Sequence, residues 1–166
     1  GRALRELHAL YPDAGFGPTF RAWIDAGEGA SAPRSASNGA AMRIAPVAWA
    51  FETLSEVLAA AERITVITHD HPDAVRGAQA VAAAVFLARR GAGKAAIRAH
   101  VEAAFGYDLS LPLDAVRPTY RFALSCNGTV PHALRAFLEA EDFEDAIRNA
   151  ISMGGDSDTL ACIAGA

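Results

Sequence analysis

Hydrophobic residues recur at helical spacing from the first residues of the chain. Leu4, Leu7 and Leu10 share one helical face, and Phe20 and Trp23 repeat the spacing after a stretch rich in proline and glycine. The pattern predicts a helix over residues 2–10 and a second short helix around residues 20–24. Residues 28–37 are rich in glycine, alanine, serine and proline, which predicts a mobile connecting loop.

Helix start and stop signals define most of the remaining chain. Pro72 suits a first helical turn, and Arg89-Arg90-Gly91 supplies a cationic last turn followed by a glycine. Thr53-Leu54-Ser55-Glu56 forms a capping box, so a helix should run from there to about Arg63. Other helices are predicted over residues 40–51, 94–105, 129–140, 142–152 and from 156 onward.

Two segments do not fit a simple helical pattern. The β-branched run at residues 64–68 is ambiguous between strand and helix, because five residues are too few to decide. Residues 109–121 contain Pro112 and Pro118 and are expected to form an irregular connection. The 39 alanines favour helix over strand, so the prediction is an all-α fold with residues 1–166 in one domain.

Composition and charge narrow the functional classes. The formal charge of −4 argues against a protein that grips nucleic acid through a basic face. The chain has no apolar run of membrane-spanning length and no signal-like start, which predicts no membrane association and a cytoplasmic location. Two cysteines are too few for a disulfide framework and fit a reducing compartment.

The acidic stretch Gly154-Gly155-Asp156-Ser157-Asp158-Thr159 is the most distinctive candidate for chemistry. Two carboxylates and a hydroxyl follow a pair of glycines, and hard oxygen ligands at this density suit Mg²⁺, Mn²⁺ or Ca²⁺. A helix N-cap explains the same residues equally well. An EF-hand loop is excluded, because Ala161 stands where its sixth-position glycine belongs and the twelfth position lies beyond Ala166.

Three further segments carry polar groups beside predicted helix starts. Ser37-Asn38-Gly39 offers backbone donors to phosphate or ribose oxygens, although a turn with an N-cap is the alternative. Thr68-His69-Asp70-His71-Pro72 contains a His-x-His pair, but the chain is too short for a metal-binding β/α barrel, which leaves a locally hydrogen-bonded helix entry. Ser125-Cys126-Asn127-Gly128-Thr129 indicates another turn, and Cys126 is interpreted as structural because no basic partner is nearby in sequence.

Taken in chain order, four segments that contain these residues, at 37–43, 68–72, 125–131 and 154–159, resemble the ADP-ribosylglycohydrolase family. The resemblance extends over nearly the whole chain with compatible spacing. It implies a compact, orthogonally packed all-α domain with a dinuclear Mg²⁺ or Mn²⁺ centre at the base of a cleft that holds ADP-ribose. Hydrolysis of an ADP-ribosylated protein or small molecule at ribose C1″ is the activity it implies.

The resemblance also implies roles for individual residues. Asp156, Asp158 and Thr159 match the family's C-terminal metal ligands, with Asp156 and Asp158 taking part in catalysis. Ser37, Asn38 and Gly39 match the loop that approaches the distal ribose and the phosphates, and His69 matches the histidine near the diphosphate.

The chain departs from the family pattern near its start. The Gly-Asp and Thr-Asp-Asp-Thr elements that supply further metal ligands do not occur, so the sequence resembles the middle and C-terminal portion of the domain. This departure keeps a second interpretation open, that of a non-catalytic ADP-ribose-binding or scaffold fragment. A preceding segment or a second chain that completes the fold is the partner which either interpretation implies.

Overall fold

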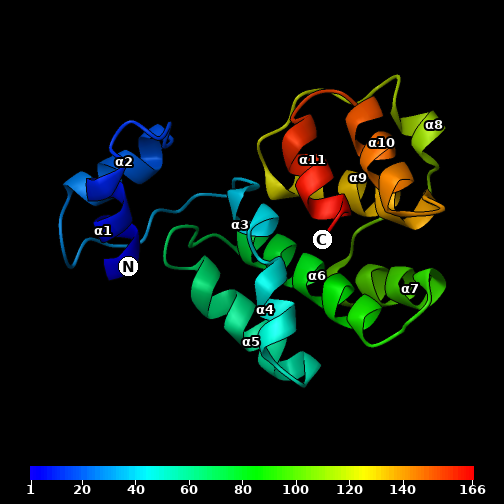
Figure 1. Cartoon of the computed structure of the whole chain (residues 1–166), viewed down its shortest axis with the longest axis horizontal. Helices are drawn as coiled ribbons and strands as arrows, with labels where there is room; N and C mark the ends of the chain where they lie inside the picture. Colours follow the sequence, from blue (N-terminus) through cyan, green and yellow to red (C-terminus); the bar gives the residue numbers. More distant parts are fainter.

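The computed structural model describes residues 1–166 and contains only helices (Figure 1). The helices are α1 (Arg2–Leu10), α2 (Pro18–Asp25), α3 (Gly39–Met42), α4 (Ala45–Ala50), α5 (Leu54–Thr65), α6 (Pro72–Arg89), α7 (Lys94–Phe105), α8 (Leu113–Val116), α9 (Cys126–Glu139), α10 (Phe143–Ser152) and α11 (Ser157–Ala164). The only β-type pairing is an isolated antiparallel bridge between Ser37 and Ser125. The predicted all-α fold is therefore confirmed.

Helix α6 lies at the centre of the fold and packs against α3, α4, α5, α7 and α9. Most of its buried side chains are alanine, which leaves room for other helices to approach its backbone closely. At Gly77 the approach is close, because an added Cβ would lie 2.7 Å from the Cβ of Cys126 on α9. The helix predicted from its start and stop signals thus forms the centre of the hydrophobic core.

Helices α1 and α2 stand apart from the other helices, at the left of Figure 1. Trp23 is the only buried residue of the two helices, and no residue before Ala40 belongs to the main hydrophobic core. Arg5 joins the two helices by donating to the carbonyl of Ile24 at 2.6 Å and lying over the Trp23 ring. The assignment of all 166 residues to one domain stays a prediction.

The structure decides the ambiguous β-branched segment and corrects three other local predictions. Helix α5 continues through Thr65 into a turn, so the β-branched run forms no strand. The helix predicted over 40–51 is divided into α3 and α4, and the connection over 109–121 contains the short helix α8. Helix α9 begins at Cys126 rather than Thr129, because Ser125 caps it by accepting from the backbone of Gly128.

Two further features concern the length of the helices and the surroundings of the two cysteines. No helix has the combination of length and apolar character needed to cross a bilayer. Both cysteines are free, but Cys126 is buried whereas Cys162 is exposed. The two thiols therefore have different surroundings, which the apolar residues beside each in the sequence did not distinguish.

Candidate functional site

The fold brings together side chains from all four segments identified in the sequence. We call this group the polar cluster, and it comprises Ser37, Asn38, Arg43, Thr68, His69, Thr129 and Asp156. The members come from segments up to 118 residues apart, yet hydrogen bonds join them into two neighbouring groups. One group surrounds the amide of Asn38 and the other surrounds the imidazole of His69.

Backbone pairing holds the loop that carries Ser37 and Asn38. The backbone N–H of Asn38 donates to Leu124 at 2.7 Å, and the N–H of Cys126 donates to Ala36 at 3.0 Å. The Cys126 thiol also donates to the carbonyl of Ser37 at 3.3 Å, and burial raises its pKa to about 11. A protonated, buried thiol is a packing group, which agrees with the structural role expected for Cys126.

The side chain of Asn38 connects the first segment to the last. Its Nδ2 donates to a carboxylate oxygen of Asp156 at 2.5 Å and to the hydroxyl of Thr129 at 3.0 Å, with the carbonyl of Ala123 at 3.3 Å. Asn38 is buried and stands at the N-cap position of α3, but its side chain caps nothing. The turn-and-cap alternative therefore does not describe this side chain.

The glycine pair before Asp156 sets the direction of that carboxylate. Gly154 and Gly155 have φ values of 69° and 65°, a backbone conformation that residues other than glycine adopt only at a cost in free energy. An added Cβ at Gly155 would also lie 2.8 Å from the ring of Tyr120. Asp156 occupies the N-cap position of α11 without capping it, so its carboxylate meets Asn38 instead.

Asp158 and Thr159 lie in the first turn of α11, beside Asp156. Asp158 is exposed, and its Oδ1 accepts from the backbone N–H of Thr159 at 2.8 Å. Thr159 is buried and its hydroxyl lies 3.7 Å from the sulfur of Met42. These oxygens suit a hard divalent cation, although no group of three or more Asp, Glu, His or Cys side chains that could hold a metal forms anywhere in the chain.

The buried imidazole of His69 bonds on both sides. Its Nε2 lies 2.8 Å from the hydroxyl of Ser37, and its Nδ1 lies 2.8 Å from the hydroxyl of Thr68 and 3.0 Å from Arg43. Desolvation, reinforced by the charge of Arg43, lowers the pKa of His69 to about 4. His69 is therefore neutral at pH 7.

His71 behaves differently from His69, although the two are separated by one residue. His71 is the N-cap of α6, and its ring accepts from the backbone of Asp73 at 3.1 Å. The local helix-entry interpretation thus describes His71 and not His69. Gly39 lies beside the cluster, because an added Cβ there would be 3.5 Å from Nε2 of His69.

Three residues of the site were not singled out from the sequence. Arg43 and Thr129 lie inside the recognised segments, but their partners are distant along the chain. Tyr120 is buried with no hydrogen-bond partner for its hydroxyl, and its pKa is raised by burial and then by Asp156. Its position in a segment expected to be irregular gave no sign that it would lie near the carboxylate.

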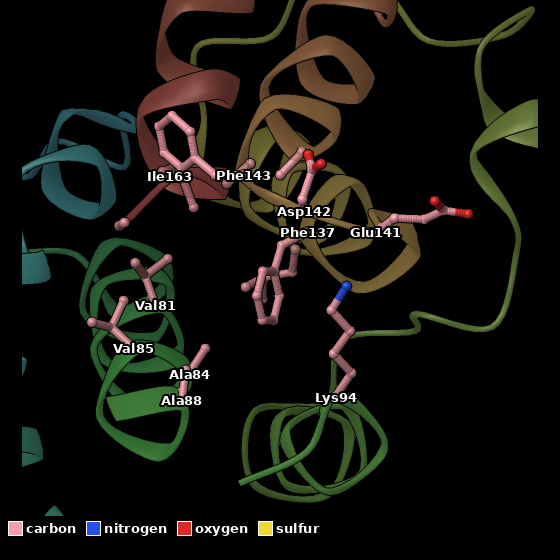
Figure 2. Close-up of a pocket in the computed structure, with 15 residues that line it drawn as sticks. Val81, Ala84, Val85, Ala88, Lys94, Phe137, Glu141, Asp142, Phe143 and Ile163 are labelled. Atoms are coloured by element: carbon pink, nitrogen blue, oxygen red, sulfur yellow. The ribbon is translucent and has the colours of Figure 1, made fainter. Parts of the chain in front are cut away.

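An apolar pocket lies elsewhere in the fold. It has a volume of about 300 Å³ and lies between α6 on one side and α9, α10 and α11 on the other (Figure 2). Val81 and Val85 face Phe137, Phe143 and Ile163 across it. None of the lining residues belongs to the four segments, so the polar cluster and the cavity are separate features.

Comparison with known proteins identifies the family of this arrangement. No curated protein matches the chain. A solved structure described as an ADP-ribosylglycohydrolase-related protein complex is similar, with a TM-score of 0.71 and 31% sequence identity. The match covers 90% of this chain and 56% of that one, so the chain spans little more than half of that relative. The ADP-ribosylglycohydrolase family model matches residues 2–166, and the chain therefore belongs to the ADP-ribosylglycohydrolase family.

Proposed function

We propose that the polar cluster is part of a site that binds ADP-ribose and supports metal-dependent hydrolysis at ribose C1″. The observation that carries this proposal is the 2.5 Å hydrogen bond between Asn38 and Asp156. It joins the loop proposed to hold the ribose and phosphates directly to Asp156, one of the residues proposed to hold the metal. The substrate class is an ADP-ribosylated protein or small molecule.

We assign roles to residues of the proposed site from their hydrogen bonds. Ser37, Asn38, Gly39 and His69 would bind the ligand, because this loop combines hydroxyl and backbone donors beside a buried imidazole. Asn38 would also orient the Asp156 carboxylate, since its amide donates to one of the two carboxylate oxygens. The remaining carboxylate oxygen stays available to a ligand.

Asp156, Asp158 and Thr159 would hold Mg²⁺ or Mn²⁺ through oxygen atoms, with water in the other positions. A bound cation would supply orientation of the ribose diol and a water, and stabilisation of charge as the glycosidic bond opens. The dinuclear centre implied by the family needs more ligands than this turn provides. A preceding segment or a partner chain is the proposed source of those ligands.

A second function from a different class has its own support. The site offers only the carboxylates of Asp156 and Asp158, and no group of three or more Asp, Glu, His or Cys side chains that could hold a metal forms in the chain. That arrangement favours a non-catalytic ADP-ribose-binding or scaffold fragment whose activity needs the completing segment. The two functions differ in turnover rather than in binding.

Calorimetric titration of the chain with ADP-ribose, with and without Mn²⁺, tests the proposal, followed by a turnover assay on ADP-ribosylated protein. Metal-dependent binding with turnover supports the hydrolase, whereas binding without turnover supports the non-catalytic function. Absence of binding refutes both for this chain.

A matched pair of variants tests the metal ligands. Asp158→Asn removes a proposed ligand and should weaken Mn²⁺ binding by about tenfold or more. Asp13→Asn removes an exposed carboxylate in the loop between α1 and α2 and should leave Mn²⁺ affinity unchanged. Equal affinity in the Asp158→Asn variant and the unmodified chain contradicts the assignment.

A further inference from the structure

The chain of hydrogen bonds around His69 has a defined direction because it starts at an arginine. One terminal nitrogen of Arg43 donates to the hydroxyl of Thr68 and lies 3.0 Å from Nδ1 of His69. A guanidinium can only donate, so Nδ1 must accept. The neutral imidazole therefore carries its single proton on Nε2.

This tautomer determines the hydrogen bonding of Ser37. With its proton on Nε2, His69 donates to the Ser37 hydroxyl oxygen across 2.8 Å. Ser35 donates its own hydroxyl proton to the same oxygen at 3.1 Å. Two donated protons occupy both lone pairs of the Ser37 oxygen, so only the Ser37 hydroxyl proton remains for a further bond.

We propose that Arg43 is a positioning residue which, through His69, makes the Ser37 hydroxyl a dedicated hydrogen-bond donor to an anionic oxygen of the ligand. The inference rests on the proposed function in identifying that oxygen as a phosphate oxygen of ADP-ribose. A hydroxyl that already accepts two hydrogen bonds is a stronger donor, and a charged acceptor benefits most from it.

The surroundings of His69 maintain this arrangement at neutral pH. Burial and the Arg43 charge disfavour the imidazolium, whose Nδ1–H would point at the donors of Arg43. The Thr68 hydroxyl accepts from Arg43 and lies 2.8 Å from Nδ1, so its own proton is directed to Nδ1 and shares the single Nδ1 lone pair with the Arg43 N–H. Both neighbours thus favour the same tautomer.

Nitrogen NMR of the histidine side chains measures the tautomer directly, without any ligand. We expect His69 in the unmodified chain to be in the Nε2–H form. In Arg43→Met, the Thr68 hydroxyl can donate or accept, so both tautomers should become populated. Arg43→Lys retains a group that only donates and should restore the Nε2–H form.

Binding of ADP-ribose measures the consequence for Ser37. Ser37→Ala and Arg43→Met should each weaken ADP-ribose binding by about tenfold, and the double variant should be no weaker than Ser37→Ala alone. Arg63→Met, which changes an exposed arginine on α5, is the matched control and should alter neither the tautomer nor the affinity.

The tautomer measurement and the binding measurement test separate parts of the proposal. An Nδ1–H form in the unmodified chain, or an unchanged tautomer in Arg43→Met, overturns the role of Arg43 whether or not ADP-ribose binds. Equal ADP-ribose affinity in Ser37→Ala and the unmodified chain overturns the donor role of Ser37. If the unmodified chain binds no ADP-ribose, the proposed function is refuted, and so is the assignment of a phosphate oxygen as the acceptor for Ser37. The NMR measurement of the His69 tautomer still tests the role of Arg43 in that case.

Discussion

The buried histidine of the polar cluster should make the stability of the fold depend on pH. His69 has a pKa of about 4 in the folded chain, against an ordinary value of 6.5. Between these two values the unfolded chain binds a proton that the folded chain does not bind. The contribution of His69 to the free energy of unfolding is therefore complete above pH 6.5 and is lost as the pH falls towards 4.

The size of the effect follows from the pKa difference. A difference of about 2.5 pH units corresponds to about 3 kcal/mol when the pH is well below 4. At pH 5 the same pKa values give a loss of about 2 kcal/mol in the free energy of unfolding, because the pH has then fallen through only part of the interval between 6.5 and 4. His132 also has a pKa of about 4, through burial and then Arg135, so the unmodified chain should lose about twice that amount.

Urea unfolding of the unmodified chain and of His69→Gln at pH 7 and pH 5 tests this reasoning. The glutamine has no titratable group, so the variant should lose about 2 kcal/mol less than the unmodified chain between the two pH values. Each protein is compared with itself, so a stability difference at pH 7 does not affect the result. An equal loss in both proteins would refute the desolvation argument for His69.

Three substitutions test other contacts of the site by urea unfolding at pH 7. Asn38→Ala removes the amide that donates to Asp156 and to the buried Thr129 hydroxyl and should cost about 1–3 kcal/mol; an unchanged midpoint would contradict this. Gly155→Ala combines a positive φ with close contacts to Tyr120 and should cost about 2–4 kcal/mol, whereas Gly154→Ala has open space and should cost about 1 kcal/mol. Equal losses in the two glycine variants would exclude the steric term. Tyr120→Phe removes a buried hydroxyl without a partner and should leave stability unchanged or raised by about 1 kcal/mol; a clear loss would reveal a hidden partner.

The sequence alone determined where most helices lie, because helix signals are local. The capping box at Thr53 and Glu56 forms as expected, with both reciprocal hydrogen bonds present. The alanine-rich segment after Pro72 forms α6, and the helix predicted over 94–105 is α7. In each case the residues that start or end the helix interact with groups only a few positions away.

The tertiary structure decided what the polar side chains do, because their partners are far away in sequence. Asn38 and Asp156 each suited a helix cap by local rules, and both stand at N-cap positions, yet they bond to each other. His69 and His71 are separated by a single residue, but only His69 is hydrogen-bonded to Arg43. A carboxylate or an imidazole can satisfy a neighbouring backbone group or a distant side chain equally well, and only the packing of the helices determines which of the two is within hydrogen-bonding distance.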